Sequence, residues 1–102
     1  MKYDHIIIGA GSAGCVLASR LSEDPDVSIL LIEAGPDYSD FESVPDDVKY
    51  GNNMWRSAYG NHSWGYPAFP TSDRDAPMII PRGKVVGGSS SINGQVICRG
   101  IP

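Results

Sequence analysis

Three glycines, Gly9, Gly11 and Gly14, stand near the start of the sequence at the spacing G-x-G-x-x-G. In this pattern the first glycine allows a tight turn, the second lets a pyrophosphate approach the backbone, and the third packs a helix on a sheet. The helix that follows offers phosphate its free N–H groups and the positive end of its dipole. Glu33 follows Gly14 after about 20 residues, the spacing of an acid that binds adenosine ribose, and its charge disfavours NADP. The pattern predicts a dinucleotide site; a turn that only packs helix on sheet is the alternative.

A second glycine-rich segment, 87–94, reads GGSSSING. Ser89 or Ser90 can cap a helix that starts here, and the free N–H groups of that helix can meet an anion or a polarised carbonyl. An ordinary capped helix after a flexible loop is the alternative for this segment taken alone. Two such segments in one chain favour a dinucleotide that is held at both its phosphates and its reactive ring.

The elements that must position these residues form a predicted βαβ unit. Residues 3–8 and 27–32 are β-rich apolar runs, typical of strands that a parallel sheet buries on both faces. Between them we expect a turn at 9–14 and a helix at 15–21, which ends at the proline-containing stretch 22–26. Two strands joined by one helix within about 30 residues are parallel, with a right-handed crossover.

The stretch 36–81 is predicted to be a long loop because its sequence shows no helical or alternating period. It carries a run of five acids with no base among them, followed by scattered aromatic residues. Loops of this length are uncommon in a compact domain unless they are functional. This one is expected either to cover a cofactor or to pack on its own aromatic side chains. After Asp75 no acid opposes Arg82, Lys84 and Arg99.

The sequence offers no catalytic group and no metal site. His5 lies in the first predicted strand and is expected to be packed or at an edge, whereas His62 lies in the polar loop and is expected to be solvated. Cys15 and Cys98 are far apart and lack the spacing of metal ligands. Both cysteines are therefore expected to be buried, reduced thiols.

The length, composition and charge of the chain exclude several classes of protein. A chain of 102 residues allows one small domain, and 41% hydrophobic residues with a net charge of −4 argue against disorder. The acidity gives no general attraction for nucleic acid, and no apolar run reaches the ~18 residues of a membrane helix. An acid where a signal peptide carries basic residues favours the cytoplasm. Because a doubly wound sheet needs more strands than these, we expect an incomplete fold, the front piece of a larger protein.

Two stretches of this sequence resemble one known family. Residues 9–35, GAGSAGCVLASRLSEDPDVSILLIEAG, are similar to the flavin-binding start of the glucose-methanol-choline (GMC) oxidoreductases. Residues 81–100, PRGKVVGGSSSINGQVICRG, resemble the first signature region of that family, and Trp64-Gly65-Tyr66 resembles its lead-in. Within the family the chain looks most like choline dehydrogenases and related bacterial alcohol dehydrogenases. The resemblance implies FAD as cofactor, a small-molecule alcohol as substrate, and hydride transfer to flavin N5.

The resemblance also implies which residues contact FAD. The pyrophosphate contacts would be Gly9, Gly11, Ser12, Ala13 and Gly14, with Glu33 on the adenosine ribose. The contacts from the second segment would be Ser89, Asn93, Gly94 and Val96, with Asn93 and Gly94 nearest the isoalloxazine ring. The catalytic histidine of the family lies far beyond the matched region, so these 102 residues alone are expected to be inactive. Some members link the flavin through a histidine at the position of Ile92, so a non-covalent flavin is expected here.

The sequence departs from the family pattern at two places. After Tyr66, Pro67-Ala68-Phe69-Pro70 stands where many members have Thr-Glu-Pro, which puts the path of this loop and the choice of substrate in doubt. Ile97 stands where an aromatic residue or alanine is usual, which we interpret as a packing variation.

The predicted fold class is thus α/β, with a Rossmann-like FAD-binding unit at its start. We expect 1–102 to be the N-terminal part of a GMC FAD-binding domain. It would comprise a βαβ unit at 1–35, a loop-rich excursion at 36–81 and a flavin-contacting segment at 82–102. Two alternatives stay open. One is an NAD-linked Rossmann dehydrogenase, which needs no second glycine-serine segment, and the other is a short, non-catalytic nucleotide-binding chain.

Overall fold

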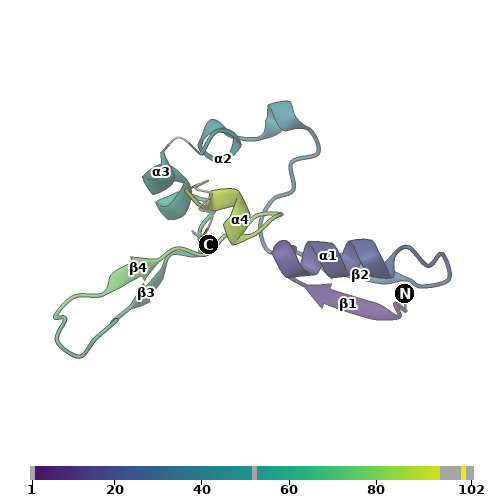
Figure 1. Ribbon diagram of the computed structural model, residues 1–102, viewed down its shortest axis with the longest axis horizontal. Helices are drawn as coiled ribbons and strands as arrows, with labels where there is room; N and C mark the ends of the chain where they lie inside the picture. Colours follow the sequence, from purple (N-terminus) through teal and green to yellow (C-terminus); the bar gives the residue numbers. More distant parts are fainter. Residues whose placement is uncertain (1, 52, 95–99, 101–102) are drawn as a thin grey trace.

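The computed structural model describes residues 2–51, 53–94 and 100. In chain order its elements are β1 (His5–Ile8), α1 (Ser12–Leu21), β2 (Ile29–Ile32), a 3₁₀ turn (Phe41–Ser43), α2 (Asp46–Lys49), α3 (Met54–Tyr59), β3 (Tyr66–Ala68), β4 (Met78–Ile80) and α4 (Ser89–Ile92). Figure 1 shows three parts that meet near α4: the β1–α1–β2 unit, the pair of helices α2 and α3, and the projecting β3–β4 hairpin.

The β1–α1–β2 unit has the predicted parallel arrangement. Its strands pair in register from His5 opposite Ile29 to Ile8 opposite Ile32. Both strands are shorter than predicted, and α1 begins at Ser12, three residues earlier than predicted. The helix begins early because only Gly9, at φ +93°, needs the left-handed region, whereas Gly11 already occupies the N-cap position. The tight turn is therefore confined to Gly9–Gly11.

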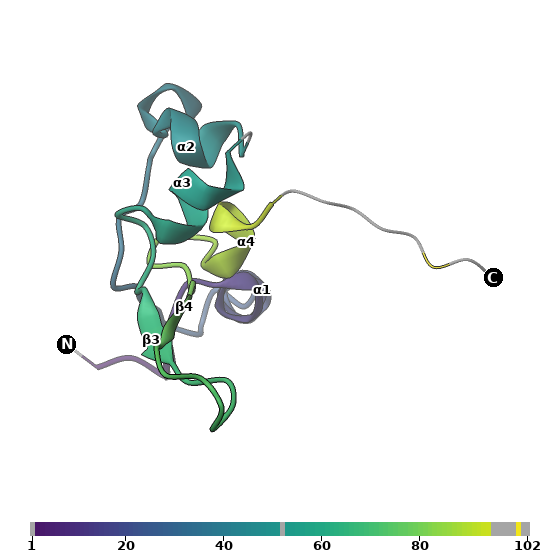
Figure 2. The same ribbon diagram turned by 90° about the vertical axis from the view of Figure 1, so that its left-hand side faces the viewer.

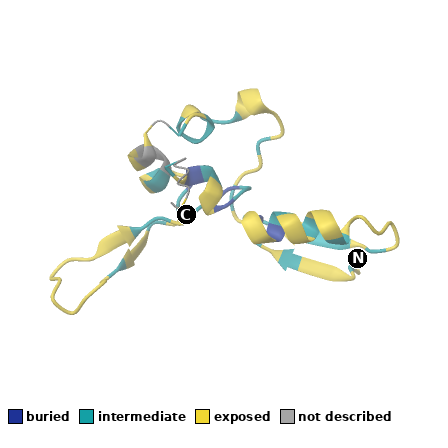
Figure 3. Cartoon of the chain, viewed as in Figure 1, coloured by how far each residue is buried: buried dark blue, intermediate teal, exposed yellow. Residues whose placement is uncertain are grey.

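The buried core lies at the junction of the three parts and not in the sheet. Among the described residues the buried hydrophobic side chains are Ala10, Val85 and Ile92, each no more than 3% exposed (Figure 3). The expectation that both strands are buried on both faces is wrong for this chain, since Ile6 is 60% and Ile8 86% exposed. One α-helix and one neighbouring strand cannot cover both faces. The radius of gyration, 16.7 Å, accordingly exceeds the ~13 Å of a compact domain of this size.

The stretch 36–81 is not one structureless loop, so that prediction is wrong. It contains two short helices and an antiparallel hairpin in which Tyr66 pairs with Ile80 and Ala68 with Met78. Seen after a 90° turn in Figure 2, the hairpin extends away from α2 and α3. Its aromatic side chains pack on one another in part, because the rings of Trp64 and Tyr66 stack with centroids 5.9 Å apart. Both rings remain nearly half exposed.

His62 is buried, contrary to the prediction that it is solvated. It is only 8% exposed, and its Nε2 shares a hydrogen bond of 2.5 Å with the Tyr38 hydroxyl. The backbone explains the difference, since the carbonyl of His62 accepts the N–H of Lys84 at 2.8 Å and Trp64 donates its N–H to Arg82 at 2.9 Å. These bonds hold the segment against 82–84, which places the imidazole under Tyr38.

The other histidine and the cysteines also differ in part from expectation. His5 is exposed at the start of β1, as an edge residue would be. Cys15 is half-buried and not fully buried, and its thiol donates a hydrogen bond to the carbonyl of Ala10 at 3.1 Å. Cys98 lies outside the described residues. Within the described ranges no helix is long and apolar enough to cross a membrane.

The side chain of Asp4, the residue before β1, binds Ser28, the residue before β2. Its Oδ2 accepts the Oγ–H of Ser28 at 2.6 Å and the N–H of Ser28 at 2.9 Å. These bonds, the side-chain bond first, hold the pKa of Asp4 below its ordinary value of 3.8. Because the pKa is lower in the folded state, the carboxylate adds stability above the unfolded-state pKa, and this stability is lost as the pH falls through the folded-state pKa.

We therefore expect the variant Asp4→Asn to lose less stability than the unaltered protein as the pH falls below 3.8. Urea unfolding at a series of acid pH values measures this slope. Asp75→Asn, in the loop of the exposed hairpin, is the control and should keep the slope of the unaltered protein. An Asp4→Asn slope equal to that of the control would show that the bond to Ser28 contributes no acid sensitivity.

Candidate dinucleotide-binding site

The two glycine-rich segments of the sequence touch in the structure. The N–H of Gly87 donates to the carbonyl of Ala10 at 2.7 Å, and Gly11 and Gly87 form an isolated parallel bridge. The approach is so close that a Cβ placed on Gly88 would lie 2.9 Å from the Cα of Gly11. Segments more than 70 positions apart in sequence therefore lie in direct contact, as a dinucleotide held at two points would require.

The turn between β1 and α1 has room for a ligand at the position where the motif requires it. A Cβ on Gly14 would overlap the carbonyl oxygen of Gly9, which shows the close helix packing expected of the third glycine. A Cβ on Gly11 would meet no atom within 4 Å. Free space thus lies beside the second glycine, the one that lets a pyrophosphate approach, and also beside Gly9. The residues present fit a dinucleotide pyrophosphate in this respect.

The start of α1, which carries the positive end of the helix dipole, faces this space. In the described part of the chain no side chain caps the helix, and its first turn contains no acid. Ser12 and Ala13 are exposed, whereas Gly14 is buried, and the first N–H groups of a helix have no partner within it. An anion at this end gains from the N–H groups and from the helix dipole together.

Glu33, at the end of β2, lies directly beside the glycine turn. Its Oε2 accepts the N–H of Ala10 at 2.7 Å, and its Oε1 accepts the N–H of Gly35 at 3.0 Å. The side chain is half-buried. Glu33 thus lies beside the glycine turn, and it makes two backbone contacts that the spacing of the motif does not suggest.

The start of α4 is built differently from the prediction. The N-cap position belongs to Gly88, at φ +61°, and no described side chain caps this short helix, so the prediction that Ser89 or Ser90 is the cap is wrong. Ser89 Oγ instead accepts the N–H of Gly83 at 3.0 Å, and Ser90 Oγ donates to the carbonyl of Gly87 at 2.6 Å. The serines fasten the loop before the helix because the double glycine lets the chain turn back on itself.

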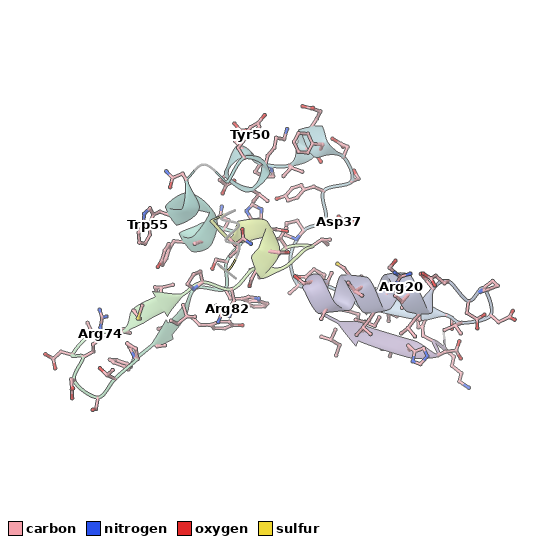
Figure 4. All side chains as sticks on the ribbon, viewed as in Figure 1. Arg20, Asp37, Tyr50, Trp55, Arg74 and Arg82 are labelled. Atoms are coloured by element: carbon pink, nitrogen blue, oxygen red, sulfur yellow. The ribbon has the colours of Figure 1, made fainter. Side chains whose placement is uncertain are left out.

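Three of the residues predicted to contact FAD line a single cavity of about 250 Å³. Its walls are Ala58, Pro81, Arg82, Ser89, Ile92, Asn93 and Gly94. Val96, the remaining predicted contact in this segment, lies outside the described residues. The sequence indicated Arg82 only as one of three unopposed bases. Figure 4 shows it at the base of the hairpin near α4, far from Arg20 and Arg74. Lys84, by contrast, packs its ammonium over the Trp64 ring at 5.2 Å.

The site contains no metal centre within the ranges that the structure describes, where no cluster of His, Cys, Asp and Glu side chains could hold a metal ion. The residue that the sequence motifs missed most clearly is Ala10, which is 1% exposed. Its N–H bonds Glu33, and its carbonyl accepts from Gly87 and Cys15. Alanine at an x position of the motif carries no sequence signal for such a role.

This mixed helix–strand chain, with its parallel βαβ unit, matches the FAD-binding region of a family of oxidoreductases. The chain belongs to the GMC oxidoreductases, whose family pattern it matches over residues 3–102. It is 50% identical over 100 residues to an oxygen-dependent choline dehydrogenase of Vibrio vulnificus, an alignment that covers 96% of this chain and 17% of that protein.

Solved structures agree with this assignment. Pyridoxine 4-oxidase from Mesorbium loti is similar with a TM-score of 0.78 and 34% identity, over 99% of this chain and 19% of that one. An FAD-dependent oxidoreductase from Chaetomium thermophilum has a TM-score of 0.71 and 33% identity, over 97% of this chain and 16% of that one. The present chain thus spans less than a fifth of the length of each of these proteins.

The comparisons confirm the resemblance to GMC oxidoreductases and to choline dehydrogenases within them. FAD, named in the description of a solved relative, is the cofactor that the sequence predicts. The family assignment favours a flavin site over the NAD-linked alternative. Which residues of this chain contact the flavin stays a prediction.

Proposed function

We propose that this chain supplies the FAD-binding part of an enzyme that oxidises a small alcohol at its CH–OH group. The observation that carries the proposal is the contact of the two glycine segments beside the open face of Gly11. In this proposal 1–35 forms the dinucleotide-binding unit, 36–81 is an excursion that carries the hairpin, and 82–102 contacts the flavin. The cytoplasmic location expected from the sequence stays a prediction.

The residues at the first glycine segment would bind the pyrophosphate and the adenosine ribose. The N–H groups of Ser12 and Ala13 point the positive end of α1 toward the phosphates, which approach over Gly11. A carboxylate has about four acceptor positions, so Glu33 can accept ribose hydroxyls while it keeps its two backbone bonds. Because the site donates hydrogen bonds at the phosphates and accepts them at the ribose, it orients the dinucleotide in one direction.

The cavity beside α4 would hold the ring of the cofactor. When bound, FAD supplies the chemistry by accepting hydride from the carbon that bears the hydroxyl group. Asn93 and Gly94 line the cavity next to Ile92, which is buried. The apolar side of the cavity, from Ala58 and Pro81, excludes water from the ring. Choline is the first alcohol to test, since the curated relatives are choline dehydrogenases.

The test is to express the full gene product, release its bound cofactor and identify it by chromatography, and then to add choline and other small alcohols with a redox dye. We expect FAD and alcohol-dependent reduction of the dye. NAD as the bound cofactor, or reduction by NADH with no response to any alcohol, would contradict the proposal. NAD and FAD titrations of the cofactor-free protein, followed by tryptophan fluorescence, give the same comparison as relative affinities.

We further expect the flavin to be held without a covalent bond to this segment. Ile92 has no nucleophile and is only 3% exposed, and His62 is buried against Tyr38. Denaturing the holoenzyme in acid and separating protein from supernatant measures this directly. Free FAD in the supernatant is the expected result, whereas yellow colour that stays with the precipitated protein would show a covalent link.

A further inference from the structure

Glu33 connects two backbone turns through one carboxylate. Oε2 accepts the N–H of Ala10 in the turn after β1, and Oε1 accepts the N–H of Gly35 in the turn after β2. Hydrogen bonds to an ionised acceptor are about twice as strong as neutral ones, and here the carboxylate is half-buried. The side chain therefore fixes the relative position of the two strand ends as well as facing the proposed ribose site.

Ala10, whose N–H binds Glu33, is also bonded directly to the second glycine segment. Ala10 is 1% exposed, and its carbonyl accepts the N–H of Gly87 at 2.7 Å. Both sides of this residue are thus fixed, the N–H by Glu33 and the carbonyl by Gly87. The peptide group that joins Ala10 to Gly11 is thus held through its carbonyl, and Gly11, like Gly9, has open space beside it.

Gly35, whose N–H also binds Glu33, packs against the residues just before the second glycine segment. A Cβ on Gly35 would overlap the backbone of Lys84, so the turn after β2 packs directly on the approach to the double glycine. Next to it, Val86 donates its N–H to the carbonyl of Pro36 at 3.1 Å. Glu33 therefore binds the first glycine turn and the turn after β2 directly, and both of these turns contact 84–87.

We propose that Glu33 is a positioning residue that orders the Gly9–Gly11 turn before the dinucleotide arrives, so that it promotes binding of the pyrophosphate as well as of the ribose. The inference rests on the dinucleotide site proposed above and adds a second role to one of its residues. A turn that is ordered in advance binds its ligand without a further loss of conformational entropy. A variant in which the Gly9–Gly11 turn is less ordered should therefore bind pyrophosphate more weakly, although Glu33 does not contact the pyrophosphate itself.

Inorganic pyrophosphate separates the two roles because it has no ribose. We expect Glu33→Gln to weaken the binding of pyrophosphate to the flavin-free protein by roughly tenfold, since the amide keeps one acceptor and loses the charge and the second acceptor. Adenosine, which has a ribose and no phosphate, reports the direct ribose contact in the same titrations. Glu23→Gln is the matched control: Glu23 pairs with Arg20 on the exposed surface at 2.7 Å, and its removal should change neither affinity.

Hydrogen exchange of the flavin-free protein provides a readout that needs no ligand. In Glu33→Gln the amides of Ala10 and Gly35 should exchange at least about tenfold faster, whereas the amide of Ser28, bonded to Asp4, should keep its rate. Glu33→Asp, which keeps the charge on a shorter side chain, should recover part of the pyrophosphate affinity. This variant also serves if Glu33→Gln does not fold.

The outcomes are distinct. Reduced pyrophosphate affinity with faster exchange at Ala10 supports the positioning role. Unchanged pyrophosphate affinity with reduced adenosine affinity would overturn it and leave Glu33 as a ribose contact only. An unaltered protein that binds neither pyrophosphate nor FAD would overturn the dinucleotide site itself, and the exchange rates would still show whether Glu33 orders the turn.

Discussion

Alanine substitutions at Gly14 and Gly11, three residues apart in one motif, should affect different properties: the first the stability of the fold, the second the affinity for FAD. Gly14→Ala should destabilise the fold, because the added methyl group overlaps the backbone carbonyl of Gly9 and lies 3.4 Å from Ile7. Backbone atoms in a tight turn cannot move aside as a flexible side chain can. A cost of roughly 1–3 kcal/mol, or more, is expected for such overpacking. Urea unfolding measures it as a lower midpoint with an unchanged slope.

Gly11→Ala should leave the fold intact and remove the ligand. Its Cβ would meet no atom within 4 Å, and its backbone, at φ −78°, suits any residue. The free energy of unfolding should therefore fall by no more than about 1 kcal/mol, the preference for glycine over alanine at an N-cap. The methyl group would nevertheless occupy the space through which the pyrophosphate approaches, so FAD affinity should fall by roughly tenfold or more.

Ser72→Ala, in the exposed loop between β3 and β4, is the control for both variants, since this loop takes no part in the site. It should keep both the stability and the FAD affinity of the unaltered protein. If Gly11→Ala binds FAD as the control does, the pyrophosphate does not lie at this turn. If Gly14→Ala is as stable as the control, α1 is not packed on β1 as the structure has it.

The β1–α1–β2 unit was predictable because its signals are local. The apolar runs at 3–8 and 27–32 indicate strands, and the glycine spacing indicates the turn and the helix between them. The exposure of Ile6 and Ile8 was not predictable in the same way. An apolar run indicates that a strand is suited to burial on both faces. Whether its residues are buried depends on which other elements pack against those faces.

The stretch 36–81 resisted prediction because its elements are short and depend on distant partners. The hairpin pairs three residues of each strand, with Pro67 in one of them and a polar loop between. His62 is buried only because Lys84 and Tyr38 bind it from outside its own segment. No period of 2 or 3.6 residues encodes such contacts. The site divides similarly: the motifs located its glycines and Glu33, whereas the bonds through Ala10 required the structure.

Gly88→Ala should damage both the fold and the site, because Gly88 stands where the two glycine segments meet. Its backbone lies at φ +61° and ψ −139°, a region that glycine alone readily adopts and that costs another residue roughly 1–3 kcal/mol. Its Cβ would also lie 2.9 Å from the Cα of Gly11, so one backbone must move away from the other. Such a movement would separate 87–88 from the turn that receives the pyrophosphate. We therefore expect lower stability together with an FAD affinity that is lower by roughly tenfold or more.

Gly65→Ala separates the two causes. Gly65 also has a positive φ, +59°, but its Cβ would meet only the Ile79 side chain at an ordinary 3.9 Å. This variant should carry the conformational cost alone and retain FAD, since it lies in the segment before the hairpin and outside the site. The extra destabilisation of Gly88→Ala over Gly65→Ala, expected to be about 1–3 kcal/mol, then measures the contact with Gly11. If the two variants lose equal stability and retain FAD equally well, the glycine segments do not meet as the structure shows, and the site cannot be formed from both of them.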